Sequence, residues 1–103
     1  MANFFEKIPQ DIPQELFQIL QESANVKIER IISKGHTSDE NFWYDQEQHE
    51  WVILMQGEAE VEFEDKKLFL KKGDYLMIEK HQKHRVSYTS EKPEALWLAV
   101  SFG

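Results

Sequence analysis

The amino-acid sequence predicts an all-β fold, a sandwich or barrel of about eight short strands that follows one short N-terminal helix. After Val26, most segments alternate apolar and polar side chains, which is the period of a strand. Glycine, proline, asparagine and aspartate separate these segments at regular intervals. The 103 residues suffice for one domain, and the absence of cysteine excludes a disulfide scaffold or a thiolate metal site.

The N-terminal segment, residues 1–25, is expected to contain the helix. Asp11 can cap its start, and Pro13 suits its first turn. The apolar residues that follow fall on one side at helical spacing: Leu16, Phe17, Ile19 and Leu20. We expect this helix to pack with its apolar side against the outside of the barrel.

Residues 26–103 are expected to form the barrel. Gly57, Asp65 and Gly73 mark turns, and residues 35–41 form a polar loop. The expected strands are residues 26–32, 42–45, 50–56, 58–64, 67–70, 75–78, 84–89 and 95–102.

The faces of these strands differ in polarity. Residues 58–64 have one apolar and one acidic face, so one side of this strand is expected to face water. Residues 50–56 and 95–102 are apolar on both faces. One face can fill the barrel, and the other needs a further layer. We therefore expect a homodimer that buries an outer face.

The formal net charge of the chain is −7. No basic cluster is long enough to follow a phosphate backbone, which argues against a nucleic-acid partner. No stretch is long and apolar enough for a signal peptide or a membrane span. The sequence therefore predicts a cytoplasmic protein with no membrane partner.

Two short motifs carry the most specific signal. Glu50 is followed, after six residues, by Gly57, and a second glycine, Gly73, precedes His84. This spacing resembles the two motifs of the cupin family, and the resemblance covers residues 26–102. It implies a small single-domain cupin of the type-2 kind, with a double-stranded β-helix or jelly-roll barrel.

The chain departs from the second motif at three places. Glu79 stands where the family has proline, His81 where it has glycine, and Tyr88 where it has asparagine. His81 therefore lies in the turn before His84. It is a candidate ligand-binding residue if the turn directs both rings toward one site; the alternative is an exposed loop histidine.

The resemblance also implies a divalent metal ion in the barrel, which in the family is held by three histidines and one glutamate. Glu50 and His84 match two of these ligands. The His-x-His pair is absent, and Gln46 is the first candidate for a third, oxygen ligand. The family allows three or four residues between the His-x-His pair and Glu50. With the longer of these spacers, Asp45 takes the role of Gln46. The resemblance does not choose among Zn, Fe, Mn and Ni as the metal.

Three further residues are candidates for binding a ligand. Tyr44 occupies one displaced His-x-His position, and with the longer spacer Trp43 does so. Arg30 shares a face with Val26 and Ile28, so an inward-facing guanidinium could anchor a carboxylate. The alternatives are a core position for Trp43 and a salt bridge for Arg30.

The leading hypothesis from sequence is a protein that binds a small molecule inside a cupin-like barrel, with or without a divalent metal ion. The resemblance spans enzymes and non-catalytic binders, so the fold does not choose a reaction. Two alternatives remain: a metal-free binding or sensing module, and a purely structural dimerising domain.

Overall fold

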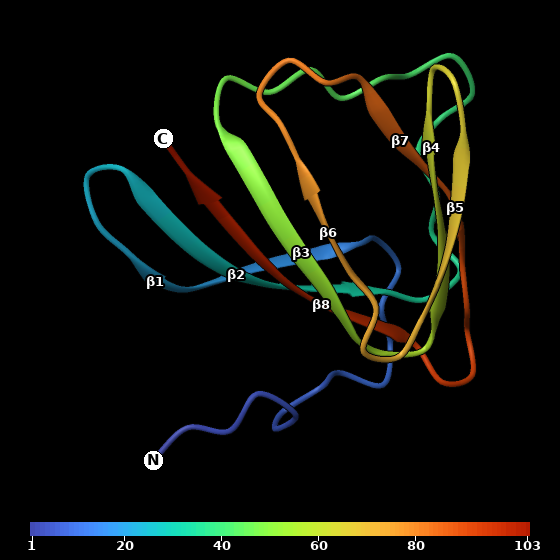
Figure 1. Cartoon of the computed structure of the whole chain (residues 1–103). Helices are drawn as coiled ribbons and strands as arrows, with labels where there is room; N and C mark the ends of the chain where they lie inside the picture. Colours follow the sequence, from blue (N-terminus) through green and yellow to red (C-terminus); the bar gives the residue numbers. More distant parts are fainter.

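The computed structural model describes residues 1–103 and is all-β, with eight strands in two antiparallel sheets (Figure 1). One sheet has five strands in the order β1-β2-β8-β3-β6, and the other has three in the order β5-β4-β7. The strands are β1 (Leu16–Glu22), β2 (Val26–Ser33), β3 (His49–Gln56), β4 (Glu58–Phe63), β5 (Lys67–Lys71), β6 (Tyr75–Ile78), β7 (His84–Thr89) and β8 (Ala95–Phe102). The predicted jelly-roll barrel is confirmed, while the division of the chain at residue 25 stays a prediction.

The predicted N-terminal helix is wrong, because its residues form β1. This strand pairs antiparallel with β2, and a register shift between Ile19 and Gln21 marks a bulge. Four apolar residues near helical spacing also suit a bulged strand, in which one extra residue changes the alternation. Without β1, the edge of β2 would leave its backbone groups unpaired.

The predicted strand at residues 42–45 is reduced to one isolated bridge between Tyr44 and His84. The chain from β2 to β3 instead runs as an irregular loop past β7 (Figure 1). Backbone hydrogen bonds join Ser38 to Val86 and Tyr44 to His84. The loop thus covers the free edge of β7, which would otherwise expose unpaired backbone groups.

The hydrophobic core lies between the two sheets. From the large sheet, Val52, Leu54 and Trp97 point inward, and from the small sheet Val61 and Phe63 meet them. Strand β4 has the two faces that the sequence predicts, since its inward residues are buried and its glutamates lie on the other face. Burial of these apolar side chains is the main force that holds the sheets together.

A second, smaller cluster lies on the outside of the five-stranded sheet. Ile12 from the N-terminal segment packs there against Ile32 and Leu96. Arg30 holds the same segment, because its Nη1 donates to the carbonyl oxygens of Phe4 (2.6 Å) and Glu6 (2.7 Å). The expectation that Arg30 faces the barrel interior is therefore wrong.

The turn between β3 and β4 depends on Gly57. Its φ of +85° lies in the left-handed region. A Cβ atom at this position would lie 2.7 Å from Ser90 Oγ and 2.9 Å from Ala95 Cα. The motif glycine therefore meets two requirements, a turn conformation and a close approach of the backbone to β8.

No helix in the structure has the length and apolar character that crossing a membrane requires.

Candidate functional site

A pocket of about 70 Å³ lies between the two sheets, and both motif residues line it. Glu50 comes from β3 of the large sheet, and His84 comes from β7 of the small sheet. Most of the lining is hydrophobic, including Val52, Val61 and Trp97. A concave apolar pocket with a few convergent polar groups is the usual form of a small-molecule site.

Glu50 sits on the inner face of β3, where it pairs with Ile78 of β6 and Ser101 of β8. Burial and, to a smaller extent, the negative charge of Glu29 raise the pKa of Glu50 to about 7, while the positive charge of Lys27 opposes this rise. Near neutral pH, this carboxyl can therefore either give or accept a proton.

His84 is almost completely buried, with 4% of its surface exposed. Its Nδ1 lies 3.0 Å from the carbonyl oxygen of Gln82, which fixes the proton on Nδ1 and leaves Nε2 as an acceptor. Burial lowers the pKa of His84, and the hydrogen bond to Gln82 partly offsets this effect. The ring is therefore neutral at pH 7, with an acceptor nitrogen in a residue that lines the pocket.

The loop beside β7 brings Tyr44 and Gln46 to the same pocket. The ring of Tyr44 stacks on that of His84, with centroids 5.3 Å apart and an interplanar angle of 24°. Burial raises the pKa of the Tyr44 phenol, with further contributions from the charges of Glu15 and Glu50. The Oε1 atom of Gln46 is buried and has no hydrogen-bond partner. A buried acceptor without a partner is uncommon in folded proteins.

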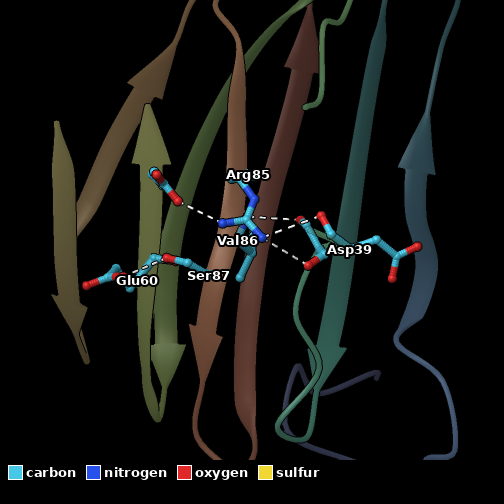
Figure 2. A network of polar contacts seen from close by, with 7 residues as sticks. Asp39, Glu60, Arg85, Val86 and Ser87 are labelled. Atoms are coloured by element: carbon cyan, nitrogen blue, oxygen red, sulfur yellow. Dashed lines mark hydrogen bonds and ion pairs between the residues drawn. The ribbon is translucent and has the colours of Figure 1, made fainter. Parts of the chain in front are cut away.

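Arg85 holds this loop in place from the outer face of β7. Its Nη1 donates to Glu62 Oε1 of β4 at 2.7 Å, and its Nη2 donates to the carbonyl oxygens of Ser38 (3.2 Å) and Asp39 (3.4 Å). Figure 2 shows the guanidinium between the small sheet and the loop at Asp39. One outward-facing arginine thus joins the small sheet to the loop that carries Tyr44 and Gln46.

Glu15 is a pocket residue that sequence reasoning missed. It lies directly before β1 and accepts a short hydrogen bond from the fully buried Ser33 of β2. Burial raises the pKa of Glu15, while the Ser33 hydrogen bond and the charge of His36 lower it. The only sequence signal was an acid between Ile12 and Leu16, and the predicted helix would have placed it elsewhere.

Four predicted candidates do not line the pocket. Trp43 is half-buried, and Arg30 is on the outer face of the large sheet. His81 is exposed, and its Nδ1 lies 2.8 Å from Asp45 Oδ1, so these two residues pair with each other. His81 also has a φ of +62°, which explains why the family has glycine at this position. Of the two alternative oxygen ligands, the structure brings Gln46 to the pocket and leaves Asp45 outside.

The structure brings no three histidine, cysteine, aspartate or glutamate side chains together in a group that could hold a metal ion. Glu15, Glu50 and His84 all line the pocket without forming such a group, and the third predicted donor, Gln46, is an amide. The predicted ligand set, Glu50, His84 and Gln46, therefore combines two ionisable donors with one neutral oxygen.

Comparison with solved structures identifies several similar folds. A protein of Ralstonia eutropha JMP134, named a putative mannose-6-phosphate isomerase, is 40% identical, with a TM-score of 0.95 over 99% of this chain and 96% of that one. A cupin superfamily protein of Desulfitobacterium hafniense DCB-2 is 23% identical, with a TM-score of 0.78 over 92% of this chain and 83% of that one. The TT1209 protein of Thermus thermophilus shares the fold at 13% identity, with a TM-score of 0.81 over 99% of this chain and 95% of that one.

No curated protein gives a significant match to this chain. The family model described as "Cupin domain" matches residues 29–101, which is most of the barrel. The matched range contains Glu50, Gly57, Gly73 and His84, and both motif glycines have the positive φ that their turns require. The chain therefore belongs to the cupin domain family.

Proposed function

We propose that this cupin binds a small molecule in the barrel pocket, held by Glu50, His84, Tyr44 and Gln46. The observation that carries the proposal is the convergence of these polar side chains, from two sheets and a loop, on one mainly hydrophobic pocket. The buried Oε1 of Gln46 lacks a protein partner, and a bound molecule would supply one. We propose that the protein binds this molecule in the cytoplasm, the location that the sequence predicts.

The pocket also supports acid–base chemistry on the bound molecule. Glu50, with a pKa near 7, can transfer a proton, and neutral His84 can accept a hydrogen bond at Nε2. The Ralstonia protein is named for an isomerase activity. Sugar isomerases move a proton between neighbouring carbons, so this pair of groups is consistent with a related type of step.

A divalent metal ion is the second candidate, and it rests on the unpartnered Gln46 oxygen. Glu50, His84 and Gln46 would hold the ion, with Zn, Fe, Mn and Ni all compatible with such a donor set. When bound, the ion would polarise a carbonyl or hydroxyl group of the ligand. Two ionisable donors and one amide fit weak binding better than tight binding.

Thermal denaturation with a panel of small amines, alcohols and carboxylic acids tests the main proposal. A ligand that binds only the folded protein raises its melting temperature. We expect some members to stabilise the wild type and to stabilise Glu50→Gln and His84→Gln less. Glu64→Gln, an exposed site outside the pocket, serves as the matched control. A panel that stabilises all four proteins equally would contradict the proposal.

Elemental analysis of untagged protein, with calorimetric titration of Zn²⁺ or Mn²⁺ alone, tests the metal candidate. We expect the metal content of Glu50→Gln and of His84→Ala to be lower than that of the wild type. Both variants must first show a cooperative unfolding transition. Metal content that is unchanged in the two folded variants would remove this candidate.

We also propose that a second copy of the chain covers the part of the outer face of the five-stranded sheet that the N-terminal segment does not cover. Trp51 and Ile53 of β3 lie on this face, paired with Val100 and Leu98 of β8 and with Met77 and Tyr75 of β6. Tyr75 is 67% exposed and Met77 is 42% exposed, so apolar surface continues to the edge.

The same patch on two copies can pair about a two-fold axis. Three strands at about 4.8 Å spacing give a patch roughly 14 Å wide. Stable interfaces bury ~800 Å² per partner, so the contact would extend beyond these three strands.

Light scattering at micromolar concentration tests this interface. We expect twice the mass of one chain for the wild type and the mass of one chain for Tyr75→Glu. Tyr88→Glu is the matched control, because Tyr88 is an exposed tyrosine on the small sheet. A monomeric wild type would contradict the interface and would leave the pocket proposal unchanged.

A further inference from the structure

The ionisable groups that line the pocket are acids, a phenol and a neutral imidazole. Glu15 and Glu50 contribute carboxyl groups, and no lysine or arginine is part of the lining. Lys27, whose charge acts on Glu50, lies outside the lining and pairs with Glu29 at 3.6 Å. The pocket therefore has no fixed positive charge with which to bind a phosphate or a carboxylate.

Hydrogen-bond acceptors outnumber donors in this pocket. Gln46 offers an unpartnered Oε1, and His84, with its Nδ1 committed to Gln82, offers Nε2. Glu15 accepts one hydrogen bond from Ser33, which leaves a second oxygen for a ligand. A matching ligand must therefore bring donors, and an ammonium group brings three together with a positive charge.

Aromatic and aliphatic side chains form the rest of the lining. Phe17 of β1, Tyr44 of the loop and Trp97 of β8 all reach the pocket. Aromatic faces attract cations, and the attraction grows when the site excludes water. The aliphatic lining, which includes Ile31 and Val86, suits a hydrocarbon chain.

We infer that the pocket takes a small protonated amine with a hydrocarbon body, whose ammonium group lies between Glu15 and Glu50. This inference rests on the proposed small-molecule function and adds the class of ligand. It also separates this chain from what the name of the Ralstonia protein suggests, because a phosphorylated sugar would meet two carboxyl groups and no lysine or arginine. Glu15 lies before the residues that the family model matches, so this part of the site belongs to the N-terminal segment.

Three probes of similar size and different charge test the inference. Isopentylamine, isopentanol and isovalerate are titrated into the full-length protein in buffer with EDTA, and binding is followed by calorimetry. We expect the amine to bind about tenfold more tightly than the alcohol, because charge-assisted hydrogen bonds are stronger than neutral ones, and isovalerate to bind least. Equal binding of amine and alcohol, or tighter binding of isovalerate, would overturn the ligand class while small-molecule binding stands. Failure of all three probes to bind would also overturn the ligand class. Thermal denaturation with the wider panel would then test the proposed small-molecule function separately.

The Glu15→Gln variant sharpens the test, because glutamine keeps the shape and an oxygen acceptor for Ser33. We expect its affinity for isopentylamine to fall about tenfold and its affinity for isopentanol to stay within about twofold of the wild type. Glu64→Gln should bind all three probes like the wild type. An unchanged amine affinity in a folded Glu15→Gln protein would exclude the role of Glu15.

Discussion

The two ends of the barrel interior differ although the same strand runs through both. At the end near Gly57, β3 contributes Leu54, which is fully buried together with Ala59 and Ala95. At the other end, β3 contributes Glu50 to an open pocket with His84 and Tyr44. One end is filled with hydrocarbon and stabilises the fold. The other keeps buried polar groups, which cost stability unless they find partners. Substitutions at the two ends should therefore shift stability in opposite directions.

The largest effect is expected at the hydrocarbon end. Leu54→Ala removes a side chain with no exposed surface, and the loss of contacts together with the cavity should lower the free energy of unfolding by about 2–5 kcal/mol. Chemical denaturation measures this change. Ile53→Ala on the outer face of the same strand should cost less, since Ile53 is only half-buried. Equal losses at the two positions would show that the sheet buries both of its faces equally in solution.

At the pocket end, Glu50 should make stability depend on pH. The pKa of Glu50 is about 7 in the folded protein, against 4.5 ordinarily, so the folded state holds the proton more firmly than the unfolded state. The stability from this group is present below pH 4.5 and is lost as pH rises through 7, by at most about 3 kcal/mol. Glu50→Gln should therefore be more stable than the wild type above pH 7, with a gap that narrows toward pH 4.5.

Denaturation of both proteins between pH 4.5 and pH 8 measures this gap. Comparing the pair cancels the opposite trend from His84, whose lowered pKa makes the folded state gain stability as pH rises toward 6.5. A gap that does not change with pH would mean that Glu50 is better solvated than its burial indicates.

A smaller effect is expected at the loop that walls the pocket. Arg85→Met removes the hydrogen bonds to Glu62, Ser38 and Asp39, and should lower the free energy of unfolding by about 1–2 kcal/mol. It should also weaken ligand binding, because the same loop carries Tyr44. Lys83→Met, an exposed basic residue nearby, is the control and should change neither quantity. Wild-type binding by Arg85→Met would mean that the contacts between Tyr44 and His84 suffice to hold the loop.

Most of the barrel could be predicted from sequence because turn residues and alternation are local signals. Alternation shows which residues share a face, but it does not show which face is inside. Arg30 does share a face with Ile28, as predicted, and that face is the outer one. Strict alternation from His84 would place Tyr88 inside, but a register shift in the pairing of β7 with β4 places it outside.

Residues of the candidate site could be predicted where a motif fixes their spacing. They could not be predicted where tertiary contacts determine which side chains reach the pocket. Glu50 and His84 reach one pocket because two strands of fixed register face each other across the barrel. Glu15 reaches the pocket because β1 pairs with β2 and because Glu15 contacts Ser33. Neither of these contacts can be recognised from a sequence pattern. His81 failed as a pocket residue because a positive φ in the turn directs it toward Asp45.

The strand that follows Glu15 is at the edge of its sheet, which has a consequence for motion. Strand β1 pairs with β2 alone, and several of its side chains are exposed. Edge strands of this kind open more readily than central ones. Each opening of β1 would loosen the attachment of Glu15, so an occupant held by Glu15 should suppress this fluctuation. Amide hydrogen exchange along β1 and β2 would then slow when the pocket fills, whereas exchange in β3 and β8 at the barrel centre would change little.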